Sequence, residues 1–526
     1  MNPNKPIRVQ RVRSSADIGA LQAQALTLLQ TEQWQPLRVL CEQAVQQKLG
    51  AGNANLWHFA AMAAWRLGDA AHALAMFDKA LALRPDATDL HSNRAVLLEE
   101  LGQLDEALLG YNQAIACAPL SAGAWANRGT LFKRMGRWRE AVSDLQQACN
   151  LAPEQAQHYY NLGMVLYGLG DLPAAQRMLA HALCLDPTHV EASWNMALCA
   201  LLQGQWQAGW PMHEARWRKQ GALLSRPLQT TRPRWQGEAC ERLLIWAEQG
   251  VGDEVFFACM FAQARARVQS MVVMCDARLL PLMQRSFPDI EFVDKHQSVP
   301  VESYDMQLPM GSLAGLFRQS DADFAQTPNS FLRADSSRVQ ALHACLQAHA
   351  GTQPALWMGL SWRSVNPQTG ADRSLSLHAL ARTLVNGVQS SAGEHGVPVR
   401  WVSLQYGDVR EEIAHLRQQT GIEVVQLAEV DNQNDLDGLA ALMTACDGVV
   451  SVQNATLHLA GALGLPMWAL LRHVPDWRWQ MHRTDSVWYP SARLVRQRVP
   501  GDWTSALTVL QQRMQMQVWE QRCVMK

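Results

Sequence analysis

The sequence has no apolar run long enough to cross a membrane, and its charges nearly cancel. Among 526 residues, Lys and Arg number 46 and Asp and Glu 47, which gives a net charge of −1. A membrane helix needs roughly 20 consecutive apolar residues, and the basic N-terminal stretch is not followed by the apolar segment of a secretory signal. We therefore expect no integral membrane segment, no nucleic acid as a partner and a cytoplasmic location.

Paired cysteines are also missing. The eleven cysteines are scattered and no CxxC occurs, so we expect reduced, mostly buried thiols and no metal site. Apolar residues make up 48% of the chain, which suffices for several cores. At this length, three or more domains are expected.

A period of 34 residues is visible between about residues 54 and 225. In each unit a glycine marks a turn between two amphipathic helices, and a proline ends the second helix. Small residues at three further places let the helices cross closely. The glycines are Gly68, Gly102, Gly136, Gly170 and Gly204; the prolines are Pro85, Pro119, Pro153 and Pro187; the small series are Ala73, Ala107, Ala141, Ala175 and Gly209, then Ala80, Ala114, Ala148 and Ala182, then Ala61, Ala95, Gly129, Gly163 and Ala197. The pattern resembles five tetratricopeptide repeats, preceded by an N-terminal tail and irregular capping helices over residues 1–53.

Four asparagines share the sixth position of successive repeats. Such repeats stack into a superhelix with a concave binding surface, and each amide offers both a donor and an acceptor. A ladder of these amides would bind an extended polypeptide with little sequence preference. The alternative is that asparagine is simply common at this place, where it caps neighbouring helices. The four are Asn93, Asn127, Asn161 and Asn195.

After a proline-containing connector at residues 226–237, apolar strands alternate with helices. Strands are predicted at LLIWA, MVVMC, IEFV and within residues 304–316, then at WMGLSWRS, RWVSLQ, IEVVQL and CDGVVSV. This alternation predicts two doubly wound parallel sheets, at residues 238–335 and 352–526. Ligands of such sheets bind outside the carboxyl ends of the strands, so we expect a cleft between the two.

The last of these strands runs directly into a helix of small residues, SVQNATLHLAGALGLP, at residues 451–466. The free N–H groups at the start of a helix favour an anion such as a nucleotide diphosphate. Asn454, Thr456 and His458 fall in the first turns, within reach of a sugar or phosphate. A strand followed by a helix with a buried histidine is also compatible with plain architecture.

The glycine loop EQGVGDE, at residues 248–254, is neither a GxGxxG motif nor a P-loop. It therefore supports neither a dinucleotide dehydrogenase nor an NTPase. The loop presents Asp253 and Glu254 at the carboxyl end of the first strand, where a carboxylate is a candidate general base. The alternative is that Asp253 caps the following helix.

Several ordered segments resemble bacterial glycosyltransferases that are fused to tetratricopeptide repeats. These enzymes are similar to the heptosyltransferase family and, more distantly, to the protein O-linked N-acetylglucosamine transferases. The segments are LLIWAEQGVGDE, GLSWRSVN, RWVSLQYGDV, NDLDGLAALMTACD, SVQNATLHLAGALGLPMW and PDWRWQMHRTDSVWYPSARLVRQ. The resemblance implies a GT-B fold of two Rossmann-like domains behind the α-helical solenoid. It also implies a metal-independent, inverting transfer with no cofactor besides the nucleotide-sugar.

Carried over by position, Asp253 matches the aspartate proposed to deprotonate the acceptor hydroxyl. Asn454, Thr456 and His458 match the turn that binds the donor. The resemblance also assigns the glycines of the EQGVGDE loop to the acceptor side; they are Gly250 and Gly252.

Arg363 and Ser364 lie where the resemblance expects the diphosphate. A cation is needed there, because the leaving diphosphate gains charge in the transition state. Gln405 is assigned near the base or ribose, and Gln453 to sugar hydroxyls, although many relatives have aspartate at that place. Arg373 is a second phosphate candidate, with a surface-loop residue as the alternative.

Four tryptophans near the C-terminus could wall a sugar site, although such aromatics more often form the core. A terminal helix is predicted at residues 502–520, which in this fold often crosses back onto the first domain. The tryptophans are Trp468, Trp477, Trp479 and Trp488.

These observations lead to one functional hypothesis and two alternatives. The hypothesis is a glycosyltransferase that moves a sugar from a nucleotide-sugar to a hydroxyl of a polypeptide held by the repeats; flagellin or another surface protein would be the acceptor by resemblance. One alternative is a heptosyltransferase-like enzyme with a saccharide or lipid-linked acceptor. The other is a non-catalytic scaffold with a decayed transferase domain, for which Gln453 is the best support.

Overall fold

The computed structural model describes residues 15–219, 227–366, 369–389 and 398–515. The chain forms two compact units: Met1–Leu166 with Arg177–Pro187, and Tyr167–Gln176 with Thr188–Lys526. The fifth repeat and one turn of the fourth thus belong to the same unit as both sheets. Each unit is described by itself below.

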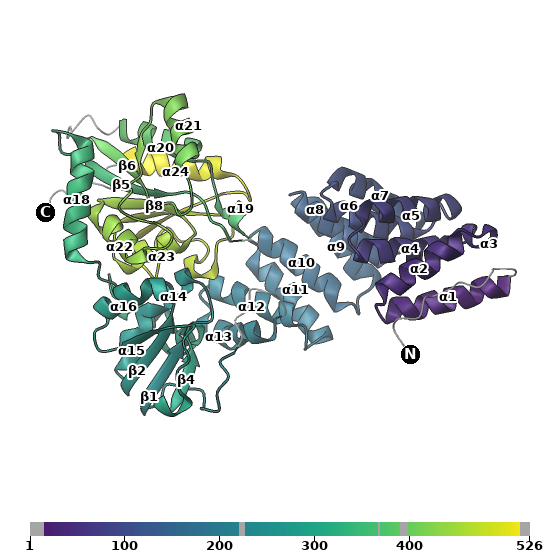
Figure 1. Cartoon of the computed structure of the whole chain (residues 1–526), viewed down its shortest axis with the longest axis horizontal. Coiled ribbons are helices and arrows are strands. Elements are labelled where there is room, and N and C mark those ends of the chain that lie inside the picture. The colour runs from purple at the N-terminus through teal and green to yellow at the C-terminus, as the bar shows by residue number, and fades with distance from the viewer. Residues whose placement is uncertain (1–14, 220–226, 367–368, 390–397, 516–526) are drawn as a thin grey trace. The chain divides into compact units, whose positions relative to one another are not determined.

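The repeat region consists of paired helices (Figure 1). Each glycine of the 34-residue series adopts a positive φ between 72° and 83° at the turn inside its pair, as predicted, since glycine enters this region without steric cost. Each proline follows the second helix of its pair by two residues. Three capping helices precede the repeats: α1 (Ser15–Gln30), α2 (Trp34–Val45) and α3 (Lys48–Ala51). The pairs are α4 (Ala54–Arg66) with α5 (Ala70–Leu83), α6 (Thr88–Glu100) with α7 (Leu104–Cys117), α8 (Ala122–Arg134) with α9 (Trp138–Leu151), α10 (Ala156–Gly168) with α11 (Leu172–Leu185), and α12 (Val190–Leu202) with α13 (Trp206–His213).

The small residues lie where paired helices approach most closely. A Cβ placed on Gly129 would lie 2.8 Å from Cγ of Leu145 in the paired helix, so any larger side chain would push the pair apart. The alanines of all three series are fully buried. The sequence pattern therefore predicted the repeat packing correctly.

The first sheet of the second unit has four parallel strands in the order β3-β2-β1-β4. The fourth strand pairs with the free side of the first, so the direction of winding reverses between β1 and β4. The strands are β1 (Cys240–Trp246), β2 (Val268–Cys275), β3 (Glu291–Asp294) and β4 (Met306–Pro309). Their helices are α14 (Val251–Phe257), α15 (Phe261–Arg265), α16 (Leu280–Ser286) and α17 (Leu313–Phe317), and the short 3₁₀ turn η1 (Glu214–Arg218) precedes them.

The second sheet has six parallel strands in the order β10-β9-β8-β5-β6-β7. Read from β5, this is the strand order of a complete Rossmann fold, with the reversal between β5 and β8. The strands are β5 (Leu356–Ser361), β6 (Val399–Ser403), β7 (Val424–Val425), β8 (Gly448–Val452), β9 (Met467–Leu471) and β10 (Ala492–Arg496). The helices are α18 (Ser336–Ala350), α19 (Gly370–Arg373), α20 (Leu377–Gln389), α21 (Arg410–Thr420), α22 (Leu436–Ala445), α23 (Ala455–Ala462) and α24 (Trp503–Gln515). The sequence reasoning missed β9 and β10, which are short and carry no helix between them except one 3₁₀ turn at Trp477–Trp479.

Helix α14 of the first sheet packs against α23 of the second, between the two sheets (Figure 1). A Cβ on Gly252 would lie 3.4 Å from Cα of Ala455, so glycine allows this close approach. The described part of the terminal helix, α24, packs on α20 and β10 of the second sheet. This differs from the expected crossing to the first domain, because Leu510 and Met514 bury their apolar faces in the second core.

Among the described residues, no helix is long and apolar enough to cross a membrane. Every cysteine in the described ranges is a free thiol, and most of them are buried.

Candidate functional site

The reversal point of the second sheet is built from the ends of β5 and β8. Asn454 follows β8 and donates through Nδ2 to Oγ of Ser361, at 2.7 Å, and to the carbonyl of Arg363, at 3.0 Å. Gln405 follows β6, and its Oε1 accepts the backbone N–H groups of Trp362, at 2.9 Å, and Arg363, at 2.8 Å. Three strands are therefore joined at their carboxyl ends by two buried amide side chains, as the sequence placed them.

Asn454 also begins α23. Its Oδ1 accepts the N–H of Leu457, which satisfies one of the free donors at the helix start. Thr456 in the first turn is only 2% exposed. These two residues therefore shape the turn, and direct contact of either with a donor stays a prediction.

Gln453 differs from its neighbours because its side-chain amide is unpaired. The residue is 3% exposed, and neither Oε1 nor Nε2 has a hydrogen-bonding partner among the described residues. Leaving a buried amide unsatisfied costs about 1–3 kcal/mol per group. An unpaired amide at the reversal point of a Rossmann sheet indicates a place that a ligand or an ordered water completes.

Asp253 lies in the first turn of α14 and does not act as the N-cap. That position is taken by Gly250, and Asp253 is the third helical residue. Oδ1 of Asp253 accepts a hydrogen bond from Nη2 of Arg478, and Nη1 of Arg478 lies 2.7 Å from Oδ1 of Asp476. The Asp253 side chain keeps 29% of its surface exposed, whereas that of Arg478 keeps 7%. One oxygen of Asp253 is thus fixed by a buried cation while the carboxylate retains an open side.

The surroundings of Asp253 act on its acidity in opposite directions. Burial is the largest influence and raises the pKa of the carboxyl, and Arg478 lowers the pKa. A carboxylate with a raised pKa is a better proton acceptor than a solvated one. This environment suits general-base chemistry, and that role stays a prediction.

His458 faces Asp253's helix from α23. Its Cδ2 would lie 3.4 Å from a Cβ on Gly252, and its Nδ1 lies 3.0 Å from the hydroxyl of Tyr489. Burial, aided by the charge of Arg478, lowers the pKa of His458 to about 3. The imidazole is therefore neutral near pH 7 and serves as a hydrogen-bonding group rather than a cation.

Glu254, unlike its neighbour Asp253, is almost completely buried. Its side chain is 1% exposed, pairs with Nζ of Lys295 at 2.9 Å and accepts the N–H of Asp276 at 2.7 Å. Glu254 is therefore locked into the first sheet.

Arg363, the first choice for the diphosphate, turns away from the reversal point. Its guanidinium is 42% exposed and lies 3.6 Å from Glu412 in α21. The backbone N–H of Ser364 donates a hydrogen bond to Oγ of Ser374. The backbone of Arg363, and not its side chain, bonds the residues of the reversal point. Its N–H donates to Gln405 and its carbonyl accepts from Asn454, while the side chain lies near Glu412.

Arg373 and Arg472 are better placed for an anion. In each, Nε is buried and has no hydrogen-bonding partner among the described residues. Burial lowers the pKa of Arg373, and the residue interacts electrostatically with Asp476, Arg472, Arg478 and Asp253. Three arginines therefore share this neighbourhood with two aspartates. Sequence reasoning missed Arg472 and Arg478. Both follow β9, and because that strand was not predicted, their position at a strand end could not be used to find them.

The tryptophans form packing contacts. Trp468, Trp477, Trp479 and Trp488 are all at most 4% exposed. Trp488 packs on Phe256 and Phe324 at centroid distances of 4.5 and 4.6 Å. Trp479 stacks on His458 at 5.5 Å and is the one that touches a predicted site residue.

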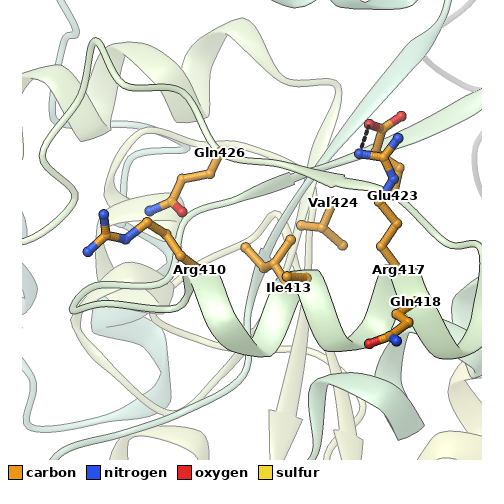
Figure 2. Close-up of a pocket in the computed structure, with 8 residues that line it drawn as sticks. Arg410, Ile413, Arg417, Gln418, Glu423, Val424 and Gln426 are labelled. Carbon is orange, nitrogen blue, oxygen red and sulfur yellow. Dashed lines mark ion pairs between the residues drawn. The ribbon is translucent and has the colours of Figure 1, made fainter.

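Two cavities lie at the β6–β7 edge of the second sheet. One, of about 510 Å³, is lined by the segments that follow β6 and β7, including Gln405, Asp408 and Asn432. The other, of about 620 Å³, lies between α21 and β7, where Arg417 and Glu423 pair at one end (Figure 2). Arg410 and Gln426 line both.

The repeat asparagines do not form a uniform set. Nδ2 of Asn93 lies 2.9 Å from Nε2 of His58, and Oδ1 of Asn161 accepts from Gln157 in its own helix. Asn127 is partly exposed. Asn195 is 9% exposed and donates to the carbonyl of Glu191, so its amide N–H is used within its own helix. The ladder stays a prediction for the first three.

Comparisons with known proteins identify the repeats. Family models described as "Tetratricopeptide repeat" match residues 60–122 and 160–209, and one described as "TPR repeat" matches residues 129–170. The curated protein FlbA from Caulobacter vibrioides is 31% identical over 327 residues, which cover 58% of this chain and 52% of FlbA. The chain thus spans about half the length of that relative.

Two solved structures match about a third of the chain at low TM-scores. YrrB, titled a TPR protein with an unusual peptide-binding site, is 22% identical and covers 33% of this chain and 88% of its own, with a TM-score of 0.28. PilF of Pseudomonas aeruginosa is 15% identical, over 38% of this chain and 90% of its own, with a TM-score of 0.35. From the family models and the helix pairs together, the N-terminal part of this chain is a solenoid of tetratricopeptide repeats.

Proposed function

We propose that this protein is a metal-independent, inverting glycosyltransferase that modifies a hydroxyl of a polypeptide bound by its repeats. One observation carries the proposal: Asp253, whose carboxylate keeps an open side at the end of the first sheet, lies on the helix packed against α23, which starts at the reversal point of the second sheet. The proposed base of the first sheet would therefore face the proposed nucleotide site of the second sheet.

The donor would lie along the carboxyl edge of the second sheet. The cavity after β6 and β7 has the position at which a Rossmann sheet holds a nucleoside, and its 510 Å³ lies within the usual range for small-ligand sites. Gln453 would bond the sugar or ribose, which satisfies its buried amide. Arg373 and Arg472, with the start of α23, would face the diphosphate.

The reaction would be a single displacement. Asp253 takes the proton of the acceptor hydroxyl while that oxygen forms a bond to the anomeric carbon. The bond from this carbon to the diphosphate oxygen breaks, and the leaving nucleotide keeps the electron pair. The arginines stabilise the growing negative charge, and attack opposite to the leaving group inverts the anomeric centre.

The repeats supply the acceptor in this proposal. A concave superhelix with the partly exposed amides of Asn93, Asn127 and Asn161 suits an extended polypeptide, whereas a saccharide or lipid-linked acceptor needs no such surface.

The first test is transfer by Asp253→Asn, with a nucleotide-sugar panel and a polypeptide acceptor. Removing a general base typically costs 10²–10⁴-fold, so we expect transfer to fall by about that factor while the donor Kd stays within about twofold. Asp305→Asn is the matched control, because Asp305 is 33% exposed and also paired with an arginine, Arg242, but lies before β4, at the amino end of the strands instead of the carboxyl end. Unchanged turnover in Asp253→Asn would remove this residue from the mechanism. Binding of no nucleotide-sugar by the wild-type protein would instead support the scaffold alternative.

A further inference from the structure

One loop of the second unit contacts both Asp253 and the last repeat turns. It is the β9–β10 loop, residues 472–491, between the two strands that the sequence did not reveal. It carries Arg478, whose guanidinium bonds Asp253 on one side and Asp476 on the other.

Arg478 is held in place by aromatic rings. Its guanidinium carbon lies 4.6 Å from the ring centre of Phe256 and 4.5 Å from that of Trp477. The attraction between a cation and an aromatic face is strongest when both are desolvated, and the Arg478 side chain is only 7% exposed. Arg478 is therefore a rigid support and not a mobile ligand-binding arm.

The same loop is tied to the turns of the fourth and fifth repeats. The N–H of Met481 donates to the carbonyl of Leu202 at 3.1 Å. Nε2 of His473 lies 3.0 Å from the carbonyl of Leu169. A Cβ on Gly204 would come within 2.9 Å of Nε2 of Gln480. All of these residues belong to the second unit.

The loop also contains strained backbone. Gln480 has a φ of 44° and His482 a φ of 63°, a region that side-chain-bearing residues rarely adopt. Such a conformation is costly for these residues and persists only where its surroundings enforce it. Arg496 of β10 enforces it here by donating to the carbonyls of Trp479 and Gln480.

We propose that Arg478 is a positioning residue for Asp253 and that the β9–β10 loop makes this position depend on the turns of the last two repeats. The inference rests on the proposed function, in which Asp253 is the base. It adds a coupling: the element that presents the acceptor also sets the orientation of the group that deprotonates it.

The first experiment measures hydrogen–deuterium exchange of residues 251–257 in the full chain. Arg478→Gln removes the charged hydrogen bond to Asp253, so we expect exchange in this segment to accelerate by roughly tenfold or more. Arg478→Lys should restore part of the protection. Unchanged exchange in Arg478→Gln would overturn the positioning role.

The second experiment tests the coupling through the repeats. Gly204→Asn and Gly136→Asn change the same turn in two repeats, at φ values of 72° and 73°, and asparagine tolerates this conformation. At Gly136 nothing lies within 4 Å of the added Cβ, whereas at Gly204 the new side chain meets the β9–β10 loop. We expect faster exchange in residues 251–257 for Gly204→Asn alone. Equal exchange in both variants would overturn the coupling.

A pH profile of transfer separates positioning from general damage. The charge of Arg478 lowers the pKa of Asp253, so its loss should move the acidic limb of kcat/KM to higher pH, and Arg478→Lys should move it less. A merely structural defect would lower the rate at every pH without moving this limb. If the protein transfers no sugar at all, the exchange experiments still decide the inference while the proposed function fails.

Discussion

The two sheets of the second unit reverse their winding in the same way but treat polar groups at the reversal point differently. In the first sheet, Glu248 follows β1, is 7% exposed and accepts the N–H of Gly311 beyond β4, and the neighbouring Glu254 is bound to Lys295. In the second sheet, Gln453 follows β8 with its amide unpaired. At its reversal point the first sheet pairs Glu248 and Glu254 with protein groups, whereas the second leaves the amide of Gln453 without a partner among the described residues. Asp253 differs from Glu248 and Glu254 because its side chain keeps 29% of its surface exposed. It lies on α14, which packs against α23 of the second sheet.

Glu254 tests this comparison with the largest expected effect. Replacing it by Gln removes the charge that pairs with Lys295, and breaking a buried ion pair from one side costs about 3 kcal/mol or more. We expect chemical denaturation to show that loss, with donor binding by the folded protein retained. A loss below about 0.5 kcal/mol would show that Glu254 is not locked into the structure.

Two buried glutamines of the second sheet sharpen the comparison. Gln405 is 1% exposed and fully bonded, whereas Gln453 is unpaired. Met has a similar volume, so Gln405→Met should lose about 2 kcal/mol, because it orphans two backbone N–H groups. Gln453→Met should gain about 1 kcal/mol in the free protein and weaken donor binding. Equal destabilisation by both would contradict the proposed difference.

At neutral pH His458 gives the smallest effect, because its contribution to stability changes only as the pH falls below about 6.5. Its pKa is lowered to about 3 in the folded protein, against about 6.5 in an unfolded chain. Between these values the unfolded state binds the extra proton, so the free energy of unfolding falls as pH falls from about 6.5 toward about 3. We expect His458→Gln to reduce this slope by up to about 1.4 kcal/mol per pH unit. An unchanged slope in urea titrations from pH 7 to 4.5 would show that His458 is not buried neutral.

The sequence predicted those features that depend on local pattern. The turns at Gly68 and its equivalents, the end of each second helix, and the start of α23 directly after Asn454 all follow from neighbouring residues. Strands with long apolar runs were found, but β9 and β10 were not, because five residues such as MWALL fit either a strand or a helix.

The contacts of the site could not be predicted where they join residues that are far apart in the sequence. Arg478 lies 225 positions from Asp253, and nothing in its segment indicates which carboxylate it meets. Arg363 was chosen over Arg373 from sequence order, yet its side chain is drawn to Glu412. Side-chain direction depends on backbone bonds to Gln405 and Asn454, which a single sequence does not reveal.

The central claim is that Asp253 faces a nucleotide-sugar site of the second sheet. Its most direct test is calorimetry of the full chain with UDP-, GDP-, ADP- and CMP-sugars. The account predicts that one nucleotide class binds, that Gln453→Met weakens this binding about tenfold or more through the loss of its hydrogen bonds, and that Asp253→Asn leaves it unchanged. Binding of none of them, or equal affinity in wild type and Gln453→Met, would contradict it.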